Sequence, residues 1–321
     1  MSTAGGQGAA RHAGIACGKV IFLGEHAVVH GVPAVAVGIE RGVRAYATPL
    51  ESGPTRLIVR EWGVEVATDD ERDLGRALRA VVEASGIEAP VSIEAQVELP
   101  PGGGLGCSAA LGVAVARALD PRALTNTITE RVMAWERVFH GNPSGIDAAV
   151  TARGGCIAFT KGEGIRTIRI GAPLTLCIGN TGVASSTRAM VEAVAHLRER
   201  RPEIVHKSFE GIKSLVRNAR LAIEAGDQFA LGRLMDLNQM LLSGIFVSTT
   251  EIEQMCAIAR AEGAFGAKLT GAGGGGCVVA LVHGSAEAER VLAAWKGAGY
   301  DGFATRVAAA GRSGQSMSES A

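Results

Sequence analysis

Three glycine-centred segments, far apart in the chain, constrain the fold more than any other feature of the sequence. They occupy residues 18–26, 100–110 and 268–277. Because glycine has no Cβ, backbone N–H groups in such segments can crowd around a bound anion. The sequence therefore predicts a fold built around a phosphorylated ligand.

The length and charge fit a two-domain protein that acts on a small molecule. The chain has 321 residues, with 32 Lys and Arg against 32 Asp and Glu. That length allows a sizeable core and is long for one domain. No basic stretch with interleaved aromatic residues is present, so we expect no nucleic-acid partner.

The cysteines and the first residues predict an intracellular protein without a membrane partner. None of the six cysteines forms a CxxC pair, which argues against a zinc knuckle or a thioredoxin-type site. Residues 1–10 have no hydrophobic signal core, and no apolar stretch is long enough to span a bilayer. We expect a soluble, cytoplasmic protein with a disordered leader at residues 1–12 and a disordered tail at residues 312–321.

The spacing of apolar residues predicts a first half with strands followed by helices. Runs rich in β-branched residues, and one alternating run, predict strands at residues 15–23, 34–39, 43–48, 57–59 and 91–99. Helical spacing predicts helices at residues 74–84, 109–119 and 127–139.

The second half is richer in helices, and we place the domain boundary at residues 171–173. Helices are predicted at residues 187–200, 204–225, 229–242, 251–262 and 286–298. Strands are predicted at residues 165–170, 174–178, 267–269, 277–282 and 303–307.

The central glycine segment has the character of a phosphate-binding loop. A predicted strand ends at Pro100, glycines turn the chain, and a helix starts at about Ser108. The first N–H groups of a helix lack partners within it, and its dipole favours negative charge. No Gly-Lys-[Ser/Thr] follows, so the loop is not a Walker A loop. The alternative is a plain glycine turn, with Ser108 as a helix N-cap instead of a magnesium ligand.

The third segment has G-x-G-x-x-G spacing but does not predict a dinucleotide fold. That motif follows a strand and opens a helix, whereas residues 277–282 after these glycines form a predicted strand. The glycines therefore connect two strands. The loop is either a flexible hairpin or a backbone support for the nucleotide or substrate.

Three charged residues stand in apolar surroundings, and each has an ordinary structural explanation. Lys19 can be a strand-end lysine that reaches solvent. Asp147 can cap a short helix, and Glu136 can lie on the solvent face of its helix. Three histidines are too scattered for a metal-ligand claim, and a polar loop position is the default for each: His26, His30 and His140.

Four segments in order resemble the mevalonate kinases of the GHMP superfamily. The strings GKVIFLGEHAVVHG at residues 18–31 and HGNPSGID at residues 140–147, which follow Glu136, are particular to mevalonate kinases. The strings GLGCSAA at residues 104–110 and KLTGAGGGGC at residues 268–277 are typical of the whole superfamily.

The resemblance implies an α/β fold with two domains. An N-terminal ATP-binding domain at residues 13–171 would carry the phosphate loop. A ferredoxin-like C-terminal domain would occupy residues 172–311. The implied reaction is the ATP- and Mg²⁺-dependent phosphorylation of the primary hydroxyl of mevalonate to 5-phosphomevalonate, in isoprenoid biosynthesis. The alternatives are a GHMP kinase for phosphomevalonate, a sugar or another hydroxy acid, and a non-catalytic relative that binds ligand. A homodimer is left open.

The resemblance also implies roles for individual residues. Lys19 and Asp147 would form the catalytic pair at the accepting hydroxyl, and Ser108 with Glu136 would hold Mg²⁺ against the ATP phosphates. Substrate-binding positions are matched by Glu25, His26 and Thr187. The ATP loop would consist of Pro101, Gly102, Gly103, Gly104, Leu105, Gly106, Cys107, Ser108 and Ala109. The supporting glycines would be Gly271, Gly273 and Gly274.

The sequence departs from the family pattern at three places. Cys17 stands where the family usually has proline, and Cys107 stands where the phosphate loop usually has serine. Neither change removes a charge or a magnesium ligand, so we expect activity to survive with altered nucleotide affinity. Residues 243–248 fit the family's helix-to-loop passage imperfectly, which bears on substrate scope.

Overall fold

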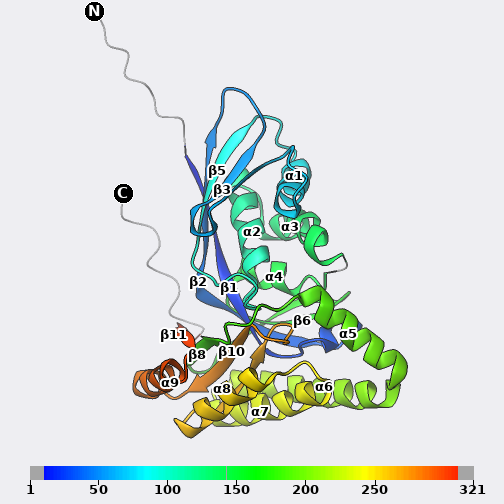
Figure 1. Ribbon diagram of the computed structural model, residues 1–321, viewed down its shortest axis with the longest axis vertical. Coiled ribbons are helices and arrows are strands. Elements are labelled where there is room, and N and C mark those ends of the chain that lie inside the picture. The colour runs from blue at the N-terminus through cyan, green and yellow to red at the C-terminus, as the bar shows by residue number, and fades with distance from the viewer. Residues whose placement is uncertain (1–10, 142, 310–321) are drawn as a thin grey trace, which may run out of the picture. The chain divides into compact units, whose positions relative to one another are not determined.

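The computed structural model describes residues 11–141 and 143–309, which form two compact units (Figure 1). The units interleave along the chain, whereas the predicted boundary at residues 171–173 divides it once. Apart from residues 11 and 12, the predicted leader lies outside the described residues, as does the predicted tail. The first unit comprises residues 11–16, 42–98 and 108–143, and the second comprises residues 17–41, 99–107 and 144–309.

The first unit contains a sheet whose strand order is β4-β3-β5-β2. Strand β5 pairs antiparallel with β2 and parallel with β3. The alternation predicted for residues 91–99 is confirmed, because Ile93, Ala95 and Val97 are buried. The strands are β2 (Ala34–Pro49), β3 (Arg56–Val59), β4 (Val64–Ala67) and β5 (Val91–Val97), and a short 3-10 helix, η2 (Arg60–Trp62), joins β3 to β4.

Three helices complete the first unit: α1 (Asp73–Ser85), α2 (Cys107–Leu119) and α3 (Thr125–His140). The middle of α2 is buried, in agreement with its run of small apolar residues. Gly112 in α2 allows a close approach, because a Cβ there would lie 3.0 Å from the ring of Trp135. Trp135 is itself fully buried, so this contact fixes α3 against α2.

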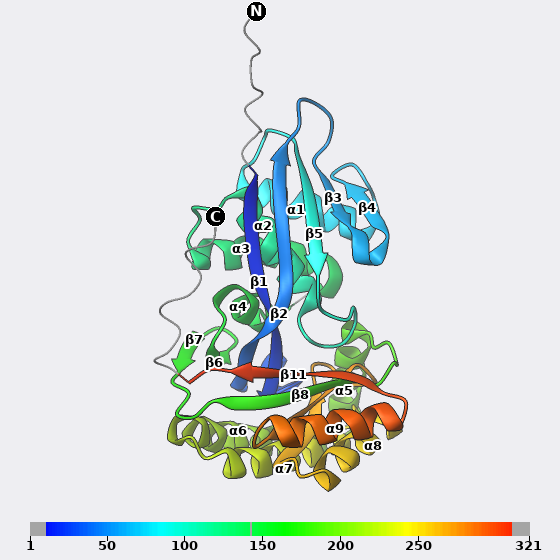
Figure 2. The same cartoon turned by 90° about the vertical axis from the view of Figure 1, so that its left-hand side faces the viewer.

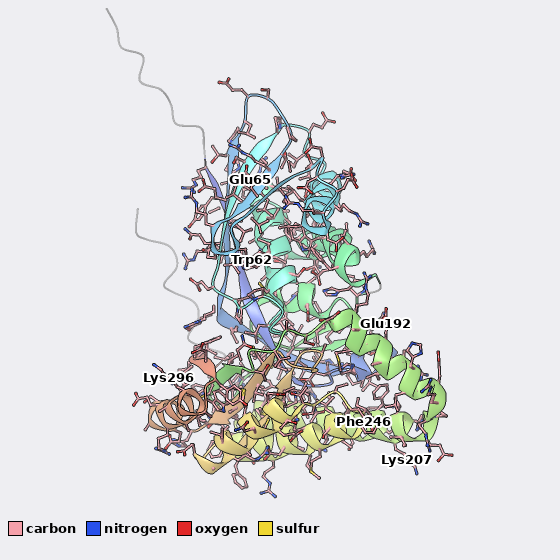
Figure 3. All side chains as sticks on the ribbon, viewed as in Figure 1. Trp62, Glu65, Glu192, Lys207, Phe246 and Lys296 are labelled. Atoms are coloured by element: carbon pink, nitrogen blue, oxygen red, sulfur yellow. The ribbon has the colours of Figure 1, made fainter. Side chains whose placement is uncertain are left out.

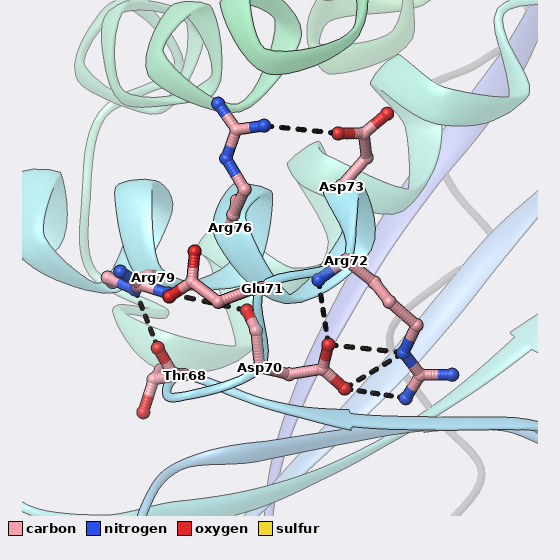
Figure 4. A network of polar contacts seen from close by, with 7 residues as sticks. All are labelled: Thr68, Asp70, Glu71, Arg72, Asp73, Arg76 and Arg79. Carbon is pink, nitrogen blue, oxygen red and sulfur yellow. Dashed lines mark hydrogen bonds and ion pairs between the residues drawn. The ribbon is translucent and has the colours of Figure 1, made fainter.

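A largely exposed polar network surrounds the start of helix α1 (Figure 4). The Asp70 carboxylate accepts hydrogen bonds from both the amide and the guanidinium of Arg72. Arg79 donates to the Thr68 carbonyl oxygen at 2.6 Å. Exposed ion pairs contribute little stability each, so the main effect of this network is to fix the turn from which α1 begins.

The second unit contains one end of strand β1 (His12–Leu23) and of β2, which pairs with β6 (Cys156–Thr160), followed by β7 (Gly164–Ile168). An apolar cluster joins these strands to helix α4 (Ile146–Arg153) and the 3-10 helix η1 (Ala27–His30). The two strands predicted at residues 34–39 and 43–48 are one strand. The polar pair before Gly42 interrupts the apolar pattern but not the extended backbone.

A second sheet of four antiparallel strands has the order β11-β8-β10-β9. Figure 2 shows β11 beside β8. With the intervening helices it gives a β-α-β-β-α-β arrangement, which confirms the expected ferredoxin-like domain. Its strands are β8 (Leu174–Asn180), β9 (Gly266–Thr270), β10 (Cys277–Val282) and β11 (Asp301–Val307).

Helices α7 and α8 pack against β9, and α9 packs against β8 and β11. Helix α6 lies along α7 and also contacts α5. Among the described residues, no helix has the length and apolar character needed to cross a bilayer. The five helices are α5 (Thr187–Arg200), α6 (Pro202–Ala225), α7 (Gln228–Gly244), α8 (Thr250–Ala261) and α9 (Ser285–Gly297).

Two glycines of α7 give a matched test of this packing. A Cβ at Gly232 would lie 2.4 Å from the backbone of Phe265, whereas nothing lies within 4 Å of a Cβ at Gly244. We expect Gly232→Ala to lower the free energy of unfolding by roughly 2 kcal/mol or more, because overpacking forces the backbone apart. Gly244→Ala should be neutral or slightly stabilising. Urea unfolding of both variants checks this, and equal midpoints would contradict the packing.

Candidate active site

Lys19 and Asp147, 128 residues apart in sequence, form an ion pair in the second unit. Lys19 lies on β1 and Asp147 in the first turn of α4, with Nζ and Oδ1 3.1 Å apart. The Lys19 side chain is only 2% exposed, whereas that of Asp147 is 33% exposed. Lys19 is therefore not a solvent-reaching lysine. Asp147 is not the helix cap either, because Gly145 holds that position.

The central glycine loop packs directly on this lysine. Gly106 has φ +71°, and a Cβ there would lie 2.8 Å from Cγ of Lys19. Gly104 has φ +74°, and its Cβ would lie 2.5 Å from the Thr270 carbonyl oxygen. The Lys19 amide donates to the Leu105 carbonyl oxygen at 2.9 Å. Glycine is needed at both positions, because φ is positive and a Cβ would find no space. The loop then leads directly into α2, which begins at Cys107.

The third glycine segment joins β9 to β10, as predicted, and it is anchored at several points. The Gly274 amide donates to the Val247 carbonyl oxygen at 2.8 Å, and the Gly276 amide donates to the Val183 carbonyl oxygen at 2.9 Å. The Ser185 hydroxyl donates to the Gly273 carbonyl oxygen. A Cβ at Gly271 would lie 2.7 Å from Cα of Gly104, so the second and third glycine segments pack backbone against backbone.

Two further predicted features border this third segment. Thr187 is the exposed first residue of α5, two positions after Ser185. The chain departs from the family pattern at residues 243–248. This passage contains Val247, whose carbonyl oxygen accepts the hydrogen bond from the Gly274 amide. Its Phe246, labelled in Figure 3, has φ +62° and is 74% exposed. The role of Thr187 at the substrate stays a prediction.

Ser108 and Glu136 meet in the first unit. The Ser108 hydroxyl donates to Oε1 of Glu136 at 2.8 Å and accepts from Nε1 of Trp135 at 3.2 Å. Glu136 is 3% exposed, so it does not lie on the solvent face of its helix. Nε2 of His140 lies 3.7 Å from the other Glu136 oxygen, Oε2.

The chemistry of this pair fits Mg²⁺. A hydroxyl has one proton and two lone pairs, so Ser108 keeps one lone pair after these two hydrogen bonds. No group of three or more His, Cys, Asp or Glu side chains suited to a metal ion occurs within residues 11–141 and 143–309. Mg²⁺ needs no such group, because it commonly takes one or two protein oxygens together with phosphate and water.

Glu25 and His26 lie at the start of η1 in the second unit. Glu25 is buried, and its carboxylate accepts hydrogen bonds from Lys268 Nζ and Asn238 Nδ2. His26 has φ +60°, and its Nε2 lies 2.8 Å from the Ala272 carbonyl oxygen. A carbonyl oxygen only accepts, so Nε2 carries the proton of this bond and Nδ1 of the neutral ring is an acceptor.

Lys268 and Asn238 were missed as site residues by sequence reasoning. Lys268 is the first residue of the third glycine segment and lies in a strand whose residues are all buried. A charged side chain there is the signal that could have revealed it. Asn238 lies in the middle of α7, and no local pattern distinguishes it from other polar helix residues.

Cys107, at the position where the family usually has serine, still makes a hydrogen bond to the residue that precedes the loop. Its thiol donates weakly to the Leu99 carbonyl oxygen, with sulfur and oxygen 3.9 Å apart. Burial raises the pKa of the Cys107 thiol to about 12. The thiol therefore stays neutral at ordinary pH and adds no charge to the loop.

Burial lowers the pKa of His26 to about 4 from its usual 6.5, against the opposing effect of the hydrogen bond to Ala272. A histidine whose folded pKa is depressed contributes full stability above its unfolded pKa. That stability is lost as pH falls from about 6.5 toward 4. We expect wild type to lose on the order of 2 kcal/mol more than His26→Gln between pH 7 and pH 5.

Urea unfolding at the two pH values measures this difference. His196→Gln is the matched control, because the His196 side chain is 75% exposed. The control should follow wild type. Parallel losses in wild type and His26→Gln would show that His26 is not held neutral.

Both halves of the chain match models of one protein family. Residues 73–155 match the GHMP kinases N terminal domain, and residues 219–301 match GHMP kinases C terminal. A mevalonate kinase of Pyrococcus abyssi is 32% identical, and the match covers 91% of this chain and 94% of that protein. A mevalonate kinase of Homo sapiens is 30% identical over 92% of each.

A solved structure extends the likeness to three dimensions. The crystal structure of L. major mevalonate kinase in complex with R-mevalonate has a TM-score of 0.81 to this chain at 27% identity. The match covers 93% of this chain and 96% of that one.

Proposed function

Since the chain belongs to the GHMP kinases and, within them, to the mevalonate kinases, we propose that it phosphorylates the primary hydroxyl of mevalonate with ATP. The product would be 5-phosphomevalonate, an intermediate of isoprenoid biosynthesis. The observation that carries the proposal is the buried Lys19 in contact with the partly exposed Asp147. The mevalonate in the L. major structure supports this choice of substrate.

Lys19 and Asp147 would act at the accepting hydroxyl. Phosphoryl transfer passes through a loose transition state, so positioning and charge stabilisation supply most of the catalysis. An aspartate is a weak base at neutral pH, so Asp147 orients the hydroxyl and takes its proton late. The Lys19 ammonium offsets negative charge on the transferred phosphoryl group. Asp147 is accessible to substrate, while the buried lysine holds its carboxylate in place.

Ser108 and Glu136 would hold Mg²⁺, with the remaining ligands supplied by nucleotide phosphates and water. The ion's chemical contribution, when bound, is to neutralise charge on the phosphates. Glu136 supplies a carboxylate oxygen, and Ser108 supplies the lone pair that its two hydrogen bonds leave over. Amides of the loop at residues 101–109 would bind phosphate oxygens.

Two other functions are compatible with the family. One is phosphorylation of phosphomevalonate, a sugar or another hydroxy acid, and the other is ligand binding without catalysis. A non-catalytic relative would be expected to lose charged site residues, whereas this chain keeps Lys19, Glu136 and Asp147. The retained residues favour a kinase.

A substrate panel tests the proposed function directly. Purified protein is supplied with ATP, Mg²⁺ and either mevalonate, phosphomevalonate, galactose or homoserine, and ADP release is coupled to mass identification of the product. We expect turnover with mevalonate alone. Turnover with another compound would change the substrate, and nucleotide binding without any turnover would favour the non-catalytic alternative.

Two variants separate the proposed roles and serve as controls for each other. Asp147→Asn should lower kcat by roughly 10²-fold or more, the usual scale for a positioned acid–base group, without a change in the Mg²⁺ concentration needed for half-maximal rate. Glu136→Gln should raise that Mg²⁺ concentration, because a neutral amide is a weaker ligand than a carboxylate.

Steady-state kinetics with Mg²⁺ titration at fixed ATP measures both effects. If Asp147→Asn turned over at the wild-type rate, Asp147 would have no role in catalysis. An unchanged Mg²⁺ titration in Glu136→Gln would remove that residue from the metal site.

A further inference from the structure

A fully buried ion pair joins Lys268 to Glu25, one of the predicted substrate-binding residues, and is not used by the proposed chemistry. The side chains of Lys268 and Glu25 both have 0% exposure, and Lys268 Nζ donates to Oε1 of Glu25. Asn238, also fully buried, donates to the second carboxylate oxygen at 3.2 Å. Removing two charges from water is costly unless they are paired and hydrogen-bonded, so this arrangement needs all three side chains.

Lys268 and Asn238 are themselves held by their surroundings. Asn238 and Gln239 are neighbours on α7, and Oε1 of Gln239 accepts from the Leu269 amide at 2.9 Å. Nε2 of Gln239 donates to Glu253 at 2.9 Å. Lys268 also donates to the Leu269 carbonyl oxygen. Helix α7 is thus fastened to β9 at Gln239, the residue next to Asn238.

Glu25 directly precedes His26, whose backbone conformation is unfavourable. Positive φ is uncommon for a residue with a Cβ and persists only where the surroundings impose it. His26 has φ +60°, and its ring reaches Ala272 in the third glycine segment. The hydrogen bonds to the Glu25 carboxylate fix the chain just before His26. The hydrogen bond to the Ala272 carbonyl oxygen fixes the His26 ring.

We propose that Lys268 and Asn238 are positioning residues for the alcohol substrate, acting through Glu25 to hold the His26 ring with Nδ1 free to accept a hydrogen bond. The inference rests on the proposed function. It assigns Glu25 to the support of His26 instead of direct substrate contact, because the Glu25 side chain is fully buried and its carboxylate is bound by two buried side chains.

The test must separate positioning from plain stabilisation. Lys268→Met leaves the Glu25 carboxylate buried without its cation, so this variant can fail to fold. The double variant Glu25→Gln/Lys268→Met removes both charges and avoids that penalty. The matched control is Arg131→Met, which breaks the partly buried Arg131–Asp120 ion pair, 2.9 Å long, in the first unit.

We expect the double variant to raise KM for mevalonate at least tenfold, with KM for ATP and kcat within about threefold of wild type. Arg131→Met should leave both KM values unchanged. Nitrogen-15 NMR of the histidine rings, with His26 assigned by its loss in His26→Gln, gives a second readout. In wild type it should show the proton on Nε2, and in the double variant this signal should shift or broaden.

Lower stability with an unchanged KM for mevalonate and an unchanged His26 signal would overturn the proposal and leave a purely structural ion pair. The NMR readout needs no substrate. If wild type proves inactive on mevalonate, the function fails while the effect of Lys268 on His26 is still decided.

Discussion

An ammonium group that is almost wholly removed from water requires an anion beside it. In the second unit, several elements are arranged around the ammonium group of Lys19 and its anion. Its partner Asp147 comes from the first turn of helix α4. The glycine loop then closes over the lysine stem, and only a residue without a Cβ fits at Gly106. One buried cation thus fixes a strand, a helix and a loop together.

The second organising constraint is close contact between backbones. A Cβ on Gly271 would clash with the backbone of Gly104, and a Cβ on Gly104 would clash with the Thr270 carbonyl oxygen. The second and third glycine segments are weak motifs individually. Their close contact is the reason that glycine is needed in both. The hydrogen bonds from Gly274 and Gly276 to neighbouring loops hold the third segment in place, so a long glycine run is ordered and not a flexible hairpin.

The sequence predicted the elements whose periodicity is strong and uninterrupted. Helix α5 and strand β10 begin and end at the predicted residues. Strand β6 was missed, because it has only five residues and short apolar runs carry little periodicity. The resemblance to a family placed Lys19 and Asp147 in one site, which local pattern alone did not require. The burial of Glu136 and the bond from Asn238 to Glu25 depend on tertiary contacts that no window of sequence contains.

The phosphate-binding role proposed for the loop at residues 101–109 has a consequence for nucleotide selection. A surface made of main-chain amides responds to the charge and spacing of phosphate oxygens, which ATP, GTP and UTP share. Main-chain amides are the same in every residue, so they cannot tell one base from another. In a kinase built this way, preference among nucleotides must come from side chains that lie outside the glycine segments, and it can change by substitution there without disturbing phosphate binding.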